Sequence, residues 1–580
     1  MYTLFPSKSA IADVPENYLH LLEVEPKSPA LVLGATSTAF LEAGWQATLN
    51  NDHILVAEQK ETNVQKEEQP EEIQLELFSN RFTGIAREMG ALLQRTAFSV
   101  NVKERLDFSC ALLDAQGDLI VNAPHIPVHL GALGVCTKAV VQALDLKEND
   151  VAITNSPAFG GSHLPDVTLI APIHFEGKLA GYAANRAHHA EIGGIAPGSM
   201  PANAQNLAQE SVVLKPQKIV EAGSLQWENF EQLLIQSPYP ARALAENRAD
   251  LNAALASIEN GKNQLLQLFK KEGAQKVLHY MGQLKKYAHY SLWKALDKME
   301  KGTFKATEFL DDGARLQVKI HLGKKLEFNF EGTSGEHPRN LNANPAIVTS
   351  VILYVLRLIA RKEIPFNEGL LEQVKIHLPE GTLLNPVLKE DPEKCPALVG
   401  GKVELSQRLT DTLLKAFSLS ACSQGTMNNV LFGNAEFGFY ETIGGGVGAT
   451  EGLAGASAVH QHMTNTRMTD TEIMEFRYPV QVREFAIRPG SGGKGKFPGG
   501  CGIVRELFFK KPVTLTALSQ HWQQAPYGMK GGQPGATGQQ FWRKASGESQ
   551  TLAHVETVKL NAGDSFRIET PGGGGFGKPE

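Results

Sequence analysis

Apolar residues along this 580-residue chain follow a helical period in several long stretches. Between residues 75 and 92 they recur at spacings of three and four, which gives one apolar face on a helix. The same period continues through residues 240–300, where Gly261 and Gly273 predict breaks. Two shorter helices are predicted further along, over residues 347–358 and 405–419.

A period of two, typical of strands with one buried face, governs other parts of the chain. Leu316, Val318 and Ile320 alternate with polar residues, and residues 326–330 do the same after a short turn, which predicts a β-hairpin. A turn at Glu176-Gly177 separates two further apolar runs, and the last hundred residues combine glycine with short strands. The fold class predicted is α/β (mixed α+β). Strand-like apolar runs lie at residues 107–113, 151–154 and 167–173.

The composition changes sharply between residues 58 and 72, where almost nothing is apolar. Such a segment cannot bury enough surface to offset its ordering entropy, so we expect a charged, flexible linker there. It would separate a small β unit over residues 1–57 from a main region over residues 73–580. We expect sub-lobes at about residues 73–239, 240–300 (helical) and 301–580.

Charge and composition exclude some classes of partner. The net charge is −6, 42% of residues are hydrophobic, and no long basic run is present, so neither nucleic acid nor an anionic membrane is expected as a partner. No apolar stretch approaches the ~20 residues that cross a bilayer, and the first residues do not resemble a secretion signal, so we expect a cytoplasmic protein. Five scattered cysteines favour a reducing compartment. Cys422 could act as a nucleophile, but a buried inert thiol is the favoured interpretation.

The candidate chemistry lies in two glycine-flanked segments, residues 160–166 and 185–194. They contain His163, Asp166, the pair His188-His189, and Glu191. A His-x-x-Asp step joined to a distant histidine can supply nitrogen and oxygen ligands to one divalent cation. The alternative is that these residues only cap helices and strand ends, but their density between paired glycines favours a site.

Other polar residues are weaker candidates. His125 and His129 are four apart, but Pro124 and Pro127 argue against a regular helix; we favour a structural role for His125 and leave His129 open as a substrate contact. His460 and His462 alternate on an expected strand, where they would line the substrate site or hydrogen-bond within the fold. Arg467 could clamp a carboxylate, although a structural ion pair is favoured.

Further motifs accompany the two glycine-flanked segments, at residues 103–110, 122–131, 197–201, 340–343, 423–429, 462–467 and 572–577. Together these stretches resemble hydantoinase B subunits, and their sequence is most similar to the C-terminal half of ATP-dependent 5-oxoprolinases. The resemblance covers about residues 75–580, and residues 1–57 resemble the last strands of hydantoinase A subunits. It departs from the family at Glu191, where an aspartate is usual, and over residues 519–526, which lack an expected arginine.

The resemblance implies a multi-lobed hydantoinase B-like fold and the ATP-dependent opening of a small cyclic amide, with 5-oxoproline hydrolysed to glutamate. The chain has no G-x-x-x-x-G-K-[ST] loop, so ATP is expected on a hydantoinase A-like partner subunit in a hetero-oligomer. An N-methylhydantoinase-type hydrolase, an acetone carboxylase-like carboxylase subunit and a non-catalytic scaffold are the alternatives.

For the metal, manganese, zinc or iron, we expect His163, Asp166 and His189 as ligands. The resemblance points the same way, because the related acetone carboxylase subunit holds manganese with matching residues. His188 would then face away or act as an acid or base, unless it only hydrogen-bonds to backbone. Asp107 and Glu191 are candidates for orienting the attacking water. The remaining candidates, for binding substrate, are His129, His462 and Arg467.

Overall fold

The computed structural model describes residues 2–6, 30–34, 38–41, 45–49, 55–59 and 70–579, apart from 124–125, 361–363 and 365. The chain forms two compact units, residues 1–74 and 75–580. In the first, β1 (Tyr2–Pro6), β2 (Ala30–Gly34) and β3 (Thr38–Leu41) form one antiparallel sheet, and β4 (Trp45–Leu49) pairs with β5 (Leu55–Gln59). Most of the expected linker lies outside the described residues.

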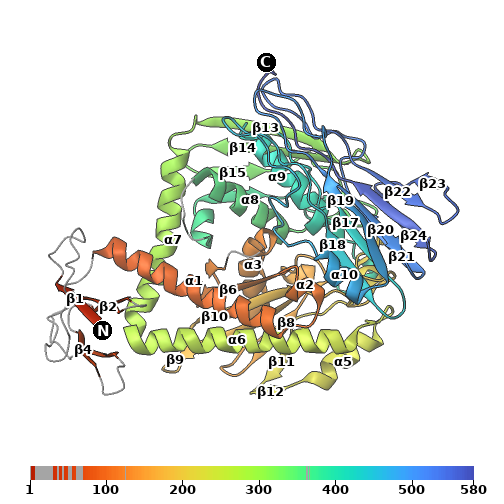
Figure 1. Cartoon of the computed structure of the whole chain (residues 1–580). Coiled ribbons are helices and arrows are strands. Elements are labelled where there is room, and N and C mark those ends of the chain that lie inside the picture. The colour runs from red at the N-terminus through yellow and green to blue at the C-terminus, as the bar shows by residue number, and fades with distance from the viewer. Residues whose placement is uncertain are drawn as a thin grey trace. The chain divides into compact units, whose positions relative to one another are not determined.

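A seven-stranded antiparallel sheet organises the first part of the larger unit (Figure 1). Its order is β12-β11-β8-β9-β10-β6-β7, so the expected hairpin of β9 and β10 lies near its middle and turns at Glu176-Gly177, both with positive φ. The bounds are β6 Phe108–Asp114, β7 Leu119–Asn122, β8 Val151–Thr154, β9 Asp166–Phe175, β10 Lys178–His188, β11 Gln217–Glu221 and β12 Ser224–Leu225.

Helices cover both faces of this sheet, which explains why its central strands are apolar without alternation. Cys110 and Leu112 of β6 pack in one core with residues of α1 (Glu71–Thr96) and α6 (Leu244–Glu272). Ala111 and Leu113 of the same strand pack in a second core with residues of α3 (Pro127–Ala143). The sheet is therefore held from both sides, and the ends of β9 and β10 are fixed in place.

The long helical stretch is broken only once among the described residues. α6 runs through Gly261, whereas Gly273 separates it from α7 (Ala274–Leu296). The break predicted at Gly261 is wrong, because this glycine serves close packing: a Cβ there would lie 2.2 Å from Met89 Sδ on α1. Ser257 confirms the contact by donating to the Met89 carbonyl at 2.9 Å.

The predicted hairpin and later helices form a second layer. β13 (Gly302–Phe309), β14 (Arg315–Leu322), β15 (Leu326–Asn329) and β16 (Val374–His377) make a four-stranded sheet, in which alternate residues of β14 are buried. Its apolar face shares a core with α8 (Pro345–Ala360) and α9 (Ser406–Ala416), close to both predicted ranges. A π-helical turn, Gly401–Leu405, leads directly into α9.

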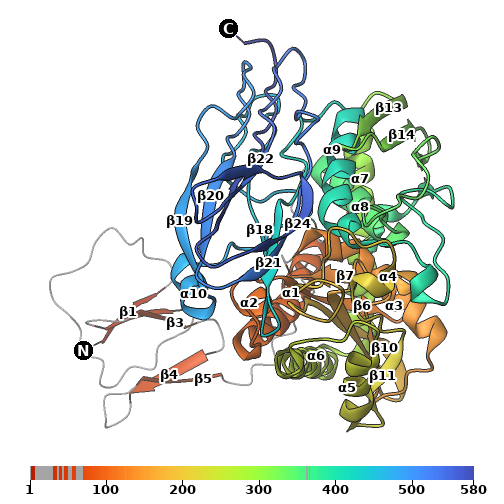
Figure 2. The ribbon, with the colours of Figure 1, turned by 90° about the vertical axis from the view of Figure 1, so that its right-hand side faces the viewer.

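The C-terminal region is a pair of packed sheets beside these helices (Figure 2). Their orders are β18-β17-β21-β24 and β19-β20-β25-β22-β23. None of the described helices is long and apolar enough to cross a membrane. The bounds are β17 Asn429–Gly433, β18 Gly438–Thr442, β19 Val480–Ile487, β20 Ile503–Phe509, β21 Val513–Leu518, β22 Gln539–Arg543, β23 Ser549–Thr551, β24 Val555–Leu560 and β25 Ser565–Glu569, with short helices α2 Val100–Lys103, α4 Leu207–Glu210, α5 Trp227–Gln236 and α10 Thr471–Arg477 elsewhere.

Replacing Gly261 by alanine should destabilise the protein by about 1–3 kcal/mol, because the added methyl group overpacks the contact with Met89. Gly282→Ala in α7 is the matched control, since nothing lies within 4 Å of its Cβ position. It should stabilise by up to about 1 kcal/mol through helix propensity. Thermal melting of both variants checks this, and a Gly261→Ala protein as stable as Gly282→Ala would contradict the packing.

Candidate metal centre

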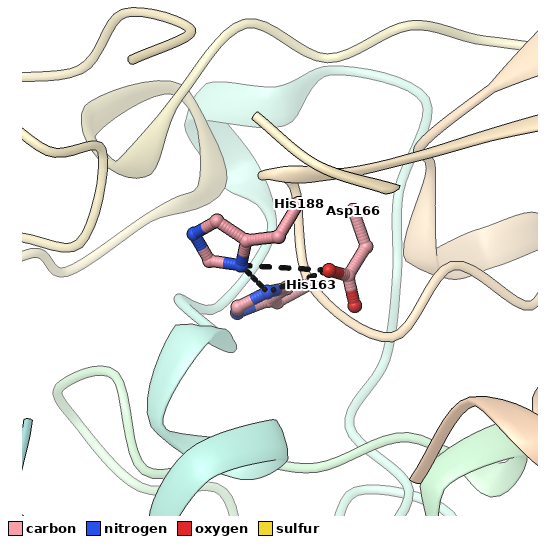
Figure 3. A group of neighbouring side chains, drawn as sticks. All are labelled: His163, Asp166 and His188. Carbon is pink, nitrogen blue, oxygen red and sulfur yellow. Dashed lines mark hydrogen bonds and ion pairs between the residues drawn. The ribbon is translucent and has the colours of Figure 1, made fainter. Parts of the chain in front are cut away.

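Three polar side chains meet at the ends of the neighbouring strands β9 and β10 and in the turn before β9 (Figure 3). Asp166 is the first residue of β9 and His188 the last of β10, and the two are paired across the hairpin. His163 lies three residues before Asp166. His163 Nε2 is 3.2 Å from His188 Nδ1 and 3.2 Å from Asp166 Oδ1, and His188 Nδ1 is 3.5 Å from Asp166 Oδ1.

These separations fit three ligands of one metal ion. Donor atoms each ~2.1 Å from a central ion lie roughly 3.0–3.4 Å apart. Among the described residues, one group of histidine, cysteine and acidic side chains has donor atoms that converge in this way. The group is His163, Asp166 and His188, and all three are buried. Two imidazoles and one carboxylate suit manganese, zinc or iron.

The protonation states also suit metal binding. Burial lowers the pKa of His163 to about 3 and also lowers the pKa of His188. For Asp166 burial acts in the opposite sense and raises the pKa, but the neighbouring His163, Lys402 and His129 keep its pKa well below the usual value. At neutral pH the rings are therefore neutral and the carboxylate is ionised, which are the protonation states that bind a metal ion.

The order of the two adjacent histidines differs from the sequence-based expectation. The structure places His188, not His189, beside His163 and Asp166. His189 Nδ1 instead contacts Asn247 Oδ1 at 2.9 Å, and Asn247 donates to the Glu191 carbonyl. Consecutive side chains at the end of a strand point to opposite sides, so only one of the pair can face Asp166. The sequence does not reveal which histidine this is, because the answer depends on the residue at which the strand ends.

Lys402 is a member of the site that the sequence reasoning missed. Its buried ammonium lies 2.8 Å from Asp166 Oδ1, 3.2 Å from His163 Nε2 and 3.9 Å from Asp107 Oδ1. It comes from the π-helical turn, a feature that often marks functional sites. The sequence around Lys402 gives no spacing that links this residue to Asp166, which lies 236 positions earlier. Only the fold therefore reveals the contact.

His129 also belongs to the surroundings of Asp166. Its Nε2 lies 3.0 Å from Asp166 Oδ2, and its Nδ1 lies 3.0 Å from Ser109 Oγ. His129 lies in a helix, contrary to the prediction from Pro124 and Pro127, because Pro127 is the first residue of α3, a position where its missing N–H costs nothing. His129 therefore orients the carboxylate from the first turn of a helix, whereas His125 lies outside the described residues.

The remaining candidates have other surroundings. Asp107 Oδ2 is 3.7 Å from His188 Nδ1, and its Oδ1 is buried without a hydrogen-bond partner. Glu191 accepts from the backbone of Gly193 and Gly198 and pairs with Arg242 at 2.8 Å, so it holds its own loop. These contacts do not include His163, Asp166 or His188.

The C-terminal candidates have other surroundings in the described structure. His462 has φ 55°, which a strand does not allow, so the predicted strand over His460 and His462 is wrong. His462 Nε2 pairs with Asp411 at 3.4 Å, and the side chain of Arg467 is exposed. Burial raises the pKa of the Cys422 thiol well above its usual value, as an inert thiol requires.

Comparisons with known proteins agree with this architecture. Residues 71–579 match the family model for hydantoinase B/oxoprolinase. The chain is 42% identical over 592 residues to 5-oxoprolinase of Saccharomyces cerevisiae, with 95% of this chain and 46% of the relative covered. It is 35% identical over 525 residues to the uncharacterised protein MJ0963 of Methanocaldococcus jannaschii, covering 88% and 91% of the two chains. The chain thus spans about half the length of the first curated relatives it matches.

Solved structures show the same fold. The ATP-dependent caprolactamase from Pseudomonas jessenii aligns with a TM-score of 0.78 and 23% identity, over 87% of this chain and 91% of the other. An acetone carboxylase in its nucleotide-free state aligns with a TM-score of 0.77 and 19% identity, over 88% and 76%. The hydantoinase B-like fold expected from the sequence is confirmed.

Substituting the two adjacent histidines should separate their roles. His188→Asn should weaken binding of Mn²⁺ or Zn²⁺ by at least about 100-fold, because it removes one of three ligands. His189→Asn is the matched control and should change the affinity by less than about threefold. Titration of the metal-free protein, followed by metal analysis after dialysis, measures both. Stronger loss in His189→Asn would contradict the assignment.

Acid should destabilise the metal-free protein through His163. Its folded pKa is about 3 and the ordinary value is 6.5, so between these values the unfolded chain binds a proton that the folded chain does not. The stability contribution is complete above pH 6.5 and is lost as pH falls towards 3. His163→Gln should reduce this dependence by up to about 1.4 kcal/mol per pH unit.

Denaturant unfolding at pH 6.5 and pH 5 in the presence of a chelator measures this slope. His321→Gln serves as the control, because His321 is exposed on β14. An unchanged slope in His163→Gln would show that its ring is protonated in the folded protein.

Proposed function

We propose, since this chain belongs to the hydantoinase B/oxoprolinase family, that it is the hydrolytic half of an enzyme that opens a cyclic amide at the expense of ATP. The substrate we favour is 5-oxoproline, converted with ATP and water to glutamate, ADP and phosphate. Relatives named 5-oxoprolinase, such as those of Arabidopsis thaliana and yeast, are 40% and 42% identical to this chain. A cyclic amide is also the substrate class named for the caprolactamase.

The observation that carries this proposal is the buried group of His163, Asp166 and His188. We assign these three as the metal ligands, with His188 in the place first expected for His189. A divalent ion there would supply an acidified water molecule and stabilise negative charge on the amide oxygen. His129 holds Asp166 from its other oxygen, which keeps the carboxylate turned towards the two imidazoles.

Asp107 is the residue we propose as general base. Its carboxylate is buried beside His188, and its Oδ1 has no hydrogen-bond partner, so it can accept a proton from a water molecule in the site. Burial raises its pKa, but Lys402, His188 and Arg105 together lower it below the usual value, so it is ionised and ready to accept. The Lys402 ammonium can then stabilise negative charge that develops on the substrate.

ATP would be bound by a hydantoinase A-type partner, because the sequence carries no phosphate-binding loop. Phosphorylation of the amide oxygen on that partner would weaken amide resonance and create a good leaving group. The M. jannaschii relative of matching length is consistent with a separate subunit of this type. We place the assembly in the cytoplasm, where the five cysteines would stay reduced.

Reconstitution with a hydantoinase A-type protein tests the proposal. The complex, but not the chain alone, should form glutamate and ADP from 5-oxoproline and ATP. Asp107→Asn should lower kcat by about 100-fold to 10,000-fold while metal content is retained, as loss of a general base predicts. Asp118→Asn is the control, because Asp118 pairs with Lys138 at 2.7 Å away from the centre, and should stay within about twofold.

Turnover by the chain alone would contradict the partner assignment, and full activity in Asp107→Asn would contradict the role of Asp107. Labelled bicarbonate and acetone, supplied to the same complex, should give no carboxylated product.

A further inference from the structure

The ring of Tyr440, on β18, lies flat against the ring of His188. The two ring centroids are 4.7 Å apart and the ring planes differ by 17°, which is the stacked arrangement that aromatic pairs favour. His163 meets the same imidazole edge to face instead, with centroids 5.0 Å apart and planes 61° apart. Tyr440 and His188 have 2% and 0% of their surface exposed, so the stack is buried.

The second nitrogen of the His188 ring has no part in the hydrogen bonds of the centre. Nδ1 faces His163 and Asp166, whereas Nε2 is buried and has no hydrogen-bond partner among the described residues. In most metal sites, the histidine nitrogen that does not bind the ion donates to a carboxylate or a carbonyl, and this bond fixes the ring. For His188, the contact that opposes rotation of the imidazole out of its plane is the stacked ring of Tyr440.

Tyr440 can hold another ring because its own position is fixed. Its hydroxyl donates to Asn429 Oδ1 at 3.0 Å, on the neighbouring strand β17. Arg105 Cζ lies over the Tyr440 ring, 4.7 Å from its centroid, and Arg105 Nη1 donates to the Tyr440 carbonyl at 2.8 Å. A guanidinium in this place is attracted by the π electrons of the ring. The residue is therefore held at its hydroxyl, at its ring and at its backbone.

The same contacts reach the other side of the metal centre. Asn429, which accepts from Tyr440, donates through Nδ2 to Glu404 Oε1 at 2.6 Å. Glu404 belongs to the π-helical turn, two residues after Lys402. Two hydrogen bonds thus connect the ring stacked on His188 to the turn that carries Lys402.

We infer that Tyr440 is a positioning residue for metal binding. Its ring keeps the His188 imidazole in the orientation in which Nδ1 faces the ion, and Asn429 ties this orientation to the π-helical turn. Ligands held in place before the ion arrives lose less freedom when it binds, which strengthens binding. The inference rests on the proposed function for His188 as a ligand, but not for the identity of the substrate.

Metal affinity, measured without substrate or ATP, tests this role. Tyr440→Leu removes the stacked ring and should weaken binding of Mn²⁺ or Zn²⁺ to the full chain by about tenfold to 100-fold, as loss of a group that orients a ligand does. Tyr440→Phe keeps the ring and should stay within about threefold of the wild-type affinity. Calorimetric titration of the metal-free chain, with a competing chelator for Zn²⁺, gives the dissociation constants.

Phe439→Leu is the matched control. Phe439 is the preceding residue of β18, is 1% exposed, and also stacks, on Phe432 with centroids 4.6 Å apart. Consecutive strand residues point to opposite faces, so Phe439 packs in the core of the C-terminal sheets, whereas Tyr440 packs in the core of α8 and α9. Phe439→Leu should lower the melting temperature, as a truncated core ring does, and change the metal affinity by less than about threefold.

A double-mutant cycle with His188→Asn shows whether Tyr440 acts through His188. The His188→Asn chain has no imidazole at this position to orient, so adding Tyr440→Leu should change its Zn²⁺ affinity by less than about threefold. Co²⁺ gives a second measurement, because the absorption spectrum of the bound ion depends on the geometry of its ligands. This spectrum should change in Tyr440→Leu and stay as in the wild type in Tyr440→Phe and Phe439→Leu.

Wild-type affinity in Tyr440→Leu would overturn the inference, and so would equal losses in Tyr440→Leu and Tyr440→Phe or an equal loss in the His188→Asn background. A wild-type chain that binds no metal would overturn it together with the ligand assignment. If Tyr440→Leu does not fold, as thermal melting shows, Tyr440→Met takes its place, because methionine fills irregular gaps. The expected cycle, with a reconstituted complex that fails to hydrolyse 5-oxoproline, would support the role of Tyr440 and refute only the proposed reaction.

Discussion

The buried carboxylate of Asp166 imposes the strongest constraint on this structure. An isolated charge taken out of water costs several kcal/mol, so partners must surround it from every side. His129 contacts one oxygen, while Lys402, His163 and His188 surround the other. These partners come from α3, the π-helical turn, the turn before β9 and the end of β10. Any fold that satisfies Asp166 must bring those four elements together.

Close packing around the metal centre holds these four elements in place. The β9–β10 hairpin is covered on both faces, and glycines allow the neighbouring backbones to approach closely. A Cβ on Gly161 would lie 2.1 Å from the Asn155 carbonyl, and one on Gly401 would lie 2.0 Å from the Asn342 carbonyl. The first glycine sets the segment that carries His163, and the second sets the turn that carries Lys402. Close backbone packing thus positions opposite sides of one site.

Local sequence patterns predict those features that depend on residues close together in the chain. The apolar stripe of α1, the β14–β15 hairpin and the pairing of His163 with Asp166 all depend on residues near one another in the chain. The choice of His188 over His189 depends on where a strand ends, and the approach of Lys402 depends on tertiary packing. His129 was placed outside a helix because proline was counted only as a helix breaker.

We propose that His163, Asp166 and His188 share one metal ion. Anomalous X-ray diffraction from crystals of the chain loaded with Mn²⁺ or Zn²⁺, collected at the metal absorption edge, locates that ion. One strong peak is expected within about 2.1 Å of His163 Nε2, Asp166 Oδ1 and His188 Nδ1. A fully loaded crystal whose peak lies elsewhere, with Lys402 still bonded to Asp166, would contradict it.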